Sequence, residues 1–220
     1  MRLSRRVFLG VGAAATVLRG GSEGMTPERV HAELAAGNRR FLSGRALHPH
    51  ATMKWVKQAA REGQHPRAVV LCCSDSRVAP EILFDQGMGD LFVVRVAGNV
   101  LREDEVGSIE YAVEHLHVPL CVVLGHSACG AVTAVVRGEH LPVEVDHLVS
   151  PIRDAFARVK QDGRVRSPAE LVDATAKEHA RATRDGVAKA SAMLSEAVKA
   201  RRLRVEAALY HLESGAVEWM

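Results

Sequence analysis

The sequence contains few aromatic residues and few cysteines. Aromatic side chains make up 4% of its 220 residues, and there are four cysteines. That number is too small for a scaffold built from disulfides, and three of the cysteines lie in or beside apolar runs that are typical of buried strands. A disulfide-rich fold is therefore excluded, and the thiols are left available for metal binding.

The chain also lacks an excess of charge outside its first 24 residues. The whole net charge of +3 falls there, where four arginines face one glutamate, and the remainder carries 25 basic and 25 acidic residues. A neutral body gives no electrostatic reason to expect nucleic acid or an anionic membrane as a partner. With 47% hydrophobic and 25% charged residues over the chain, residues 25–220 have the composition and length of one globular domain.

Residues 1–24 are best treated as a leader. Residues 4–9 (SRRVFL) resemble a twin-arginine export signal, and the Gly/Ala-rich stretch after them is too short to span a bilayer as a helix. Because twin-arginine export carries folded proteins, a metal could be loaded before transport. We therefore expect a periplasmic or secreted protein. The other interpretation is a disordered basic tail, and the protein would then be cytoplasmic. Separately, Met25 could be an alternative start.

The remaining sequence alternates strand and helix patterns. Short β-branched and aliphatic runs predict strands, and apolar residues at helical spacing predict helices. Strands are expected from residue 69 to the corner at Cys73, then at 91–95, 120–126 and 203–210, with a short hairpin at 216–219 after Gly215. Helices are expected at 26–41 with a soft break at Gly37, then at 53–61, 80–84, 105–116, 130–136, 145–159, and from 167 past 199 with a break near Gly186. This order predicts an α/β fold: a central, mostly parallel β-sheet flanked by helices, with an N-terminal helical arm.

Two of the expected strands end in residues that carry chemistry. The first is followed by Cys73, Asp75 and Arg77, and a later one ends in His126, with Cys129 at the start of a helix. Since the carboxyl ends of neighbouring strands meet at one edge of an open sheet, we expect Cys73, His126 and Cys129 to lie together. Two thiolates and an imidazole suit zinc, and three protein ligands leave a fourth position for water. We therefore predict a catalytic site with one Zn²⁺ per subunit, in which the helix dipole favours the Cys129 thiolate.

The motifs Cys73-x-Asp75-x-Arg77 and Gly125-His126-x-x-Cys129-Gly130 resemble the signature of the β-class carbonic anhydrases. The similarity extends to residues 74–81, 89–95, 108–112 and 208–210, so it covers the whole body of the chain. The first motif alone is a weak pattern, but paired with the second at the end of a later strand it is a strong one. The resemblance implies the fold of that family and its reaction, the reversible hydration of CO2 to bicarbonate and a proton.

The chemistry and the resemblance assign the same roles to the residues at the strand ends. Zinc lowers the pKa of a bound water and generates hydroxide, which attacks CO2. Asp75 is expected to orient that water by accepting a hydrogen bond, and Arg77 to hold Asp75 ionised and in place. In one branch of the family the aspartate can swing onto the zinc and close the site, and such members have Trp three residues before the first ligand. Val70 stands at that position here, so we expect an open site.

The resemblance also implies a substrate pocket and an assembly. Gln64, nine residues before Cys73, resembles an amide that reaches the site from a partner subunit, and Phe92, Gly98 and Gly130 are expected to bind substrate or to wall the pocket. Val96 departs from the Asn that the family often has after the strand-end arginine, which leaves the details of the pocket open. We expect a homodimer or a higher even homo-oligomer, with the N-terminal helices packed over the partner and no cofactor other than zinc.

Other interpretations of these residues stay open. The same scaffold could act on another small linear substrate, such as carbonyl sulfide or carbon disulfide, or the metal could stabilise a non-catalytic assembly module. Asp75 and Arg77 could form an ordinary surface ion pair, whereas Cys72 and Cys121 are expected to be buried core residues. The other histidines are expected mostly at the surface or at caps, and one of them could shuttle protons: His31, His48, His50, His115, His117, His140, His147, His179 and His211.

Overall fold

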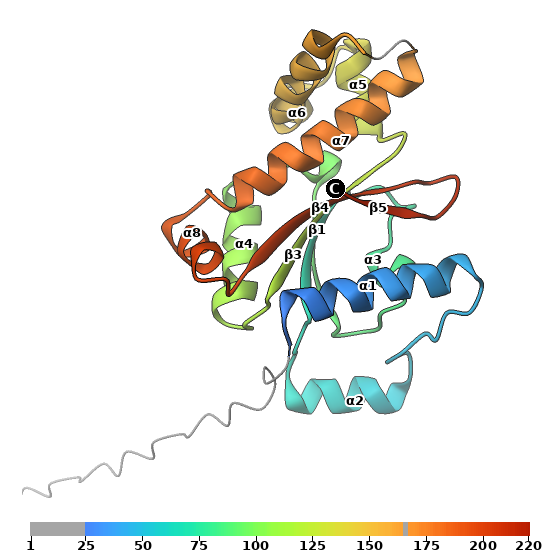
Figure 1. Cartoon of the computed structure of the whole chain (residues 1–220), viewed down its shortest axis with the longest axis vertical. Coiled ribbons are helices and arrows are strands. Elements are labelled where there is room, and N and C mark those ends of the chain that lie inside the picture. The colour runs from blue at the N-terminus through green and yellow to red at the C-terminus, as the bar shows by residue number, and fades with distance from the viewer. Residues whose placement is uncertain (1–24, 165–166) are drawn as a thin grey trace, which may run out of the picture.

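The computed structural model describes residues 25–164 and 167–220 (Figure 1). The expected leader, residues 1–24, lies outside the described residues, so export stays a prediction. None of the described helices combines the length and the hydrophobicity needed to cross a lipid bilayer.

A five-stranded sheet with the order β2-β1-β3-β4-β5 forms the centre of the molecule. Four strands run parallel, and β5 pairs antiparallel with β4 as the terminal hairpin. The strands are β1 (Ala68–Cys72), β2 (Leu91–Arg95), β3 (Leu120–His126), β4 (Arg204–Tyr210) and β5 (Val217–Trp219). The predicted α/β class and mostly parallel sheet are confirmed, because each apolar run in the sequence forms the strand expected of it.

Helices cover both faces of the sheet and its carboxyl edge (Figure 1). They are α1 (Pro27–Leu42), α2 (Met53–Glu62), α3 (Pro80–Leu83), α4 (Glu103–Glu114), α5 (Gly130–Arg137), α6 (Val143–Asp162), α7 (Pro168–Val187) and α8 (Ala192–Lys199), with a short 3-10 turn, η1 (Ala97–Asn99). Side-chain caps fix several starts. Thr26 accepts a hydrogen bond from the Arg29 N–H at α1, and Ser167 and Glu170 form a capping box at α7.

The two faces of the sheet bury different side chains because neighbours on a strand point in opposite directions. Val69 and Leu71 join a cluster with α4, α7 and α8, whereas Val70 and Cys72 join a cluster with α1 and α3. Cys121 lies in the first of these clusters. Both Cys72 and Cys121 are free and fully buried, so their predicted place in the core is confirmed.

A third cluster lies past the carboxyl ends of the strands, where α5, α6, α7 and η1 meet. It contains Cys73 and Cys129 together with apolar residues such as Val100, Ile152 and Leu209. α7 packs against both β3 and β4 and so reaches this edge of the sheet. The fold therefore builds a buried, closely packed environment around the predicted metal ligands.

One detail of the expected helices is wrong. Gly37 does not interrupt α1, which is continuous from Pro27 to Leu42. Its role is close packing: a Cβ at this position would lie 1.7 Å from the backbone oxygen of Phe84. Because Gly37 has no side chain, α1 can approach the end of α3. The glycine is required by this buried contact, so the predicted helix break at Gly37 is wrong.

Candidate metal centre

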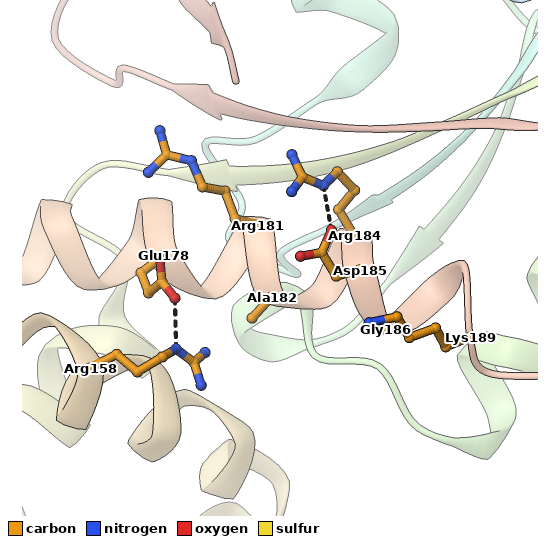
Figure 2. Close-up of a pocket in the computed structure, with 8 residues that line it drawn as sticks. All are labelled: Arg158, Glu178, Arg181, Ala182, Arg184, Asp185, Gly186 and Lys189. Atoms are coloured by element: carbon orange, nitrogen blue, oxygen red, sulfur yellow. Dashed lines mark hydrogen bonds and ion pairs between the residues drawn. The ribbon is translucent and has the colours of Figure 1, made fainter.

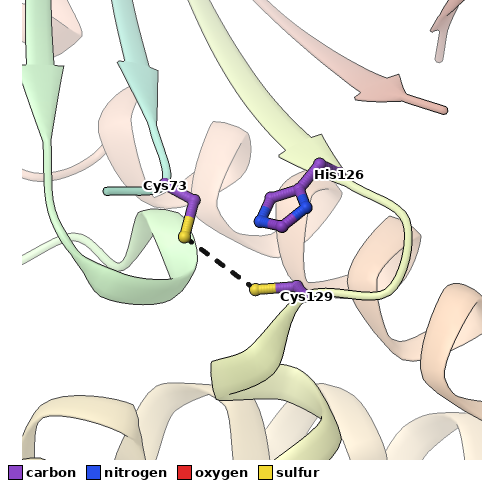
Figure 3. A group of neighbouring side chains, drawn as sticks. All are labelled: Cys73, His126 and Cys129. Carbon is purple, nitrogen blue, oxygen red and sulfur yellow. Dashed lines mark hydrogen bonds between the residues drawn. The ribbon is translucent and has the colours of Figure 1, made fainter. Parts of the chain in front are cut away.

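Two adjacent strand ends bring the predicted ligands together. Cys73 follows the last residue of β1, His126 is the last residue of β3, and Cys129 is the N-cap of α5. Because β1 and β3 pair in parallel, these three side chains converge beyond the same edge of the sheet (Figure 3). Their donor atoms all lie within 4.8 Å of one another, and all three residues are buried.

His126 presents a nitrogen that nothing else in the described structure satisfies. Its Nδ1 lies 3.0 Å from the backbone oxygen of Ser127, which can only accept, so Nδ1 carries the proton. Nε2 is then a free lone pair. It is buried and has no hydrogen-bond partner among the described residues. A buried polar atom without a partner costs free energy, and a metal ion beside the two sulfurs would satisfy it.

The Cys73 sulfur is surrounded by donors. Its Sγ accepts the N–H of Gly98 at 3.3 Å and of Asp75 at 3.4 Å, and it lies 4.0 Å from the Sγ of Cys129. The hydrogen bond from the Cys129 thiol is the main cause that lowers the pKa of Cys73, to about 4. The backbone N–H groups of Gly98 and Asp75 lower it further, and burial opposes them. The site is therefore prepared to hold a thiolate.

Cys129 differs from Cys73 in the direction of its pKa shift. Its pKa is raised, chiefly because it shares a hydrogen with the Cys73 sulfur and is buried. The backbone N–H groups of Val132 and Ala131 at the start of α5 act in the opposite direction. The predicted effect of the helix start on Cys129 is thus present, but the hydrogen bond and burial outweigh it. A coordinated thiol is deprotonated outright.

The donor set fits zinc, the cofactor of this site. Two sulfurs and one imidazole nitrogen are borderline-soft ligands of the kind found in three-ligand catalytic zinc sites. The Asp75 carboxylate does not belong to the set of donor atoms within 4.8 Å of one another. Among the described residues, the protein therefore offers three ligands and leaves a fourth position to a small molecule.

Asp75 and Arg77 form a tight pair beside the ligands. Arg77 donates from Nε to Oδ1 at 2.9 Å and from Nη2 to Oδ2 at 2.7 Å, and its backbone N–H also donates to Oδ1. Oδ2 lies 3.9 Å from the Nε2 of His126. The side chain of Asp75 is 15% exposed and that of Arg77 is 56% exposed, so the carboxylate is turned towards the ligands and the guanidinium towards solvent.

Two further side chains, which the sequence analysis did not single out, hold the backbone around the metal ligands. Arg95, the last residue of β2, donates to the carbonyl oxygens of Cys73 and Asp75. Asp173 on α7 accepts the N–H of Ala128, a residue with a positive φ of 50° between the two ligands His126 and Cys129. Such contacts depend on strand register and helix docking, for which no sequence pattern exists.

One histidine that we expected at the surface or at a cap is buried. His179 on α7 is 2% exposed, and its Nε2 lies 2.9 Å from the backbone oxygen of Gly98. Gly98, which we expected to bind substrate or to wall the pocket, donates its N–H to the Cys73 sulfur and has a φ of 69°. The expectation for His179 was wrong because its burial follows from the docking of α7 and not from any local pattern.

The other predicted pocket residues lie at different distances from the ligands. Gly130 is the exposed first residue of α5, next to Cys129. Phe92 lies near the start of β2, opposite Val69, and packs with the Tyr111 ring. Gln64 is exposed in the loop before β1, at the end of that strand opposite to Cys73. Within one subunit, Phe92 and Gln64 are therefore not brought to the metal ligands.

Two hollows lie near the outer side of α7. A cavity of about 830 Å³ includes Arg77, Ser127 and Ala128 in its lining, and so adjoins the outer side of the ligand loop. A second, of about 450 Å³, lies over α7 and α6 (Figure 2). Ion pairs join Arg158 to Glu178 and Arg184 to Asp185 there, and none of its lining residues is a metal ligand. The metal centre is therefore separate from this charged surface.

Comparison with known proteins gives one consistent result. A model of the carbonic anhydrase family matches residues 68–217. The chain is 40% identical over 189 residues to a carbonic anhydrase of Mycolicibacterium smegmatis, covering 84% of this chain and 89% of that protein. It is also 40% identical over 186 residues to carbonic anhydrase 2 of Mycobacterium tuberculosis, covering 83% and 87%.

Solved structures show the same fold. The β-carbonic anhydrase CafA of Aspergillus fumigatus superposes with a TM-score of 0.68 at 26% identity, over 76% of this chain and 86% of that one. A structure described among two tetrameric β-carbonic anhydrases of Sordaria macrospora gives a TM-score of 0.70 at 24% identity, over 88% and 97%. With its metal centre and its fold in agreement, the chain belongs to the carbonic anhydrase family and is a carbonic anhydrase of the β class.

Proposed function

We propose that the protein hydrates CO2 reversibly to bicarbonate and a proton, with zinc held by Cys73, His126 and Cys129. The observation that carries the proposal is the free, buried Nε2 of His126, which faces two sulfurs at ligand spacing. When bound, zinc supplies a Lewis acid that lowers the pKa of a coordinated water towards neutrality. The family assignment supports the reaction, and the geometry around Asp75 supports the roles of the residues beside the metal.

Asp75 is the residue that would orient the reacting water. Arg77 is the main cause that holds the pKa of its carboxyl well below the usual range, with burial acting against it. An ionised carboxylate can only accept hydrogen bonds. Asp75 would accept a hydrogen bond from a water that lies between the three ligands. One lone pair of that water would then point at CO2, so that the water is oriented before the reaction.

Arg77 would keep that carboxylate in its working position. Two side-chain hydrogen bonds and one backbone N–H hold both oxygens of Asp75 and would oppose its movement onto the metal. Val70, buried in β1 where members with a closed state have Trp, agrees with this view. We therefore propose that the resting site is open.

The second subunit of a homodimer would complete the pocket through Gln64. The edge strand β2 is partly exposed along its length, and large apolar side chains are exposed around α1, α2 and α3: Leu42, Leu47, Met53, Ile82 and Met88. An exposed strand edge and apolar surface favour association. Mixing subunits that carry Gln64→Ala with subunits that carry Asp75→Asn tests this proposal. Activity should reappear in mixed dimers if Gln64 acts across the interface, and should stay absent if it acts within its own subunit.

Asp75→Asn provides the direct test of the catalytic proposal. The variant should retain zinc, because Asp75 is not among the three ligands, but should lose about 10²-fold in the rate of CO2 hydration because the water is misoriented. Cys73→Ser should lose zinc and activity together. Asp185→Asn, an exposed aspartate that pairs with Arg184 on α7, is the matched control and should change neither.

Stopped-flow measurement of CO2 hydration, with zinc content determined on the same samples, gives both quantities. If Asp75→Asn keeps the full rate, or if metal-free protein works as fast as loaded protein, the proposal fails. Running the same assay with carbonyl sulfide shows whether CO2 is the better substrate. A higher turnover of carbonyl sulfide would contradict the assignment to CO2.

A further inference from the structure

His179 occupies an unusual position for a histidine outside the metal site. It lies on the inner face of α7, 2% exposed, with Nε2 2.9 Å from the backbone oxygen of Gly98. α7 is also in contact with the strand that carries His126, since the Ala176 oxygen and the Ala180 Cβ both lie 3.4 Å from where a Cβ on Gly125 would be. The helix thus touches the strand that ends in His126 and the η1 turn whose Gly98 N–H donates to the Cys73 sulfur.

The hydrogen bond fixes the state of the ring. The carbonyl oxygen of Gly98 can only accept, so Nε2 of His179 must carry the proton. Burial is the main cause that lowers the pKa of His179 to about 4, and the charge of Arg158 acts in the same direction, while the bond to Gly98 opposes both. At neutral pH the ring is neutral and acts as a buried donor.

Gly98 continues the connection to the metal ligand. Its N–H donates to the Cys73 sulfur at 3.3 Å while its carbonyl accepts from His179. The residue is confined, because its φ is 69° and a Cβ would lie 2.8 Å from the Cδ1 of Ile152 and 3.1 Å from the Cβ of Ala131. One residue, with little freedom to move, therefore bridges α7 and the thiolate.

We propose that His179 is a positioning residue of the metal centre: it fixes Gly98 so that the Gly98 N–H meets the Cys73 sulfur. Two thiolates bring negative charge into a buried site, and a buried charge without donors is costly. Groups behind the ligands of a metal site commonly tune its affinity in this way. The inference rests on the zinc-binding part of the proposed function and is independent of which substrate is turned over.

Three variants separate positioning from ordinary core packing. His179→Phe keeps a ring but removes the donor, whereas His179→Gln keeps an amide N–H at a similar reach. Thr175→Val is the matched control one turn away, because Thr175 is fully buried and its hydroxyl donates only to Leu171 in the same helix. Zinc dissociation constants, measured by competition with a chelator on the full chain, should rise about 10- to 100-fold in His179→Phe. They should stay near the wild-type value in His179→Gln and Thr175→Val.

The absorption spectrum of the cobalt-substituted protein provides a measurement that a change in packing alone would not alter. Loss of a donor to a thiolate should shift the sulfur-to-cobalt charge-transfer band to lower energy in His179→Phe and leave it in place in the other two variants. Unchanged zinc affinity and an unchanged band in His179→Phe would overturn the proposal. So would equal losses in all three variants, which would show general damage to α7.

The wild-type protein offers a test that needs no folded variant. Since coupling between two sites is reciprocal, removing zinc should change the chemical shift or the solvent exchange of the His179 Nε2–H, followed by NMR. Insensitivity of that proton to zinc would contradict the proposal even if His179→Phe fails to fold. Because none of these measurements uses CO2, they can succeed when the catalytic proposal fails, and the reverse is also possible.

Discussion

Gly98→Ala tests the confinement around the metal centre with a single methyl group. The φ of 69° places the residue in the left-handed region, which costs a residue with a Cβ about 1–2 kcal/mol. The new Cβ would also lie 2.8 Å from the Cδ1 of Ile152 and 3.1 Å from the Cβ of Ala131, and overpacking of this kind costs about 1–3 kcal/mol. We therefore expect a loss of roughly 2–5 kcal/mol in the free energy of unfolding.

Urea denaturation of the zinc-loaded and metal-free proteins measures this loss. It should be larger in the zinc-loaded protein, because displacing the Gly98 N–H from the Cys73 sulfur also weakens metal binding, and a ligand that binds only the folded state contributes to its stability. Adding Ile152→Val should recover part of the contact cost but not the backbone cost. Gly107→Ala, an exposed helical position with no atom near the new Cβ, is the control and should gain about 0.5–1 kcal/mol. A loss below about 0.5 kcal/mol in Gly98→Ala would refute the reasoning.

Two further predictions concern the stability of the fold. Gly37→Ala should lower the free energy of unfolding by at least about 3 kcal/mol. The added Cβ would overlap the Phe84 backbone oxygen at 1.7 Å, so α1 would have to move. A thermal midpoint equal to that of the wild type would contradict this prediction. The buried His179 has a pKa of about 4 in the fold against an ordinary value of 6.5, so its contribution to stability is complete above pH 6.5 and is lost as the pH falls to about 4. That contribution amounts to about 3 kcal/mol at most. Denaturant titrations across this range should give a steeper pH dependence for the wild type than for His179→Gln, and parallel curves would contradict the burial argument.

The sequence carried enough information to predict the sheet and the ligand set. Strands buried on both faces appear as short aliphatic runs, such as the one that ends in Cys72, and the chemistry follows directly after them. Cys73 and His126 could be placed together because parallel neighbours end at one edge. Asp75 and Arg77 are two residues apart in a turn, so their pairing is local and also visible in the sequence.

What the sequence could not predict depends on docking between distant segments. Arg95 reaches the Cys73 carbonyl because the register of β2 against β1 places Arg95 opposite Cys72, and nothing local encodes that register. His179 is buried because α7 packs over the strand ends, although the surrounding residues would suit an exposed helix equally well. Gly37 was interpreted as a helix break because a glycine required by a neighbouring backbone looks the same in a sequence as a glycine that ends a helix.

The coordination shell of the loaded protein tests the central claim most directly. X-ray absorption at the zinc edge on the full chain should give two sulfurs at about 2.3 Å, one nitrogen at about 2.0–2.1 Å and one light atom from solvent. Cys129→Ser, like Cys73→Ser, should bind less zinc, and the zinc that it retains should show one sulfur fewer. A shell without sulfur, or one filled by four protein ligands, would contradict both the metal centre and the activity proposed for it.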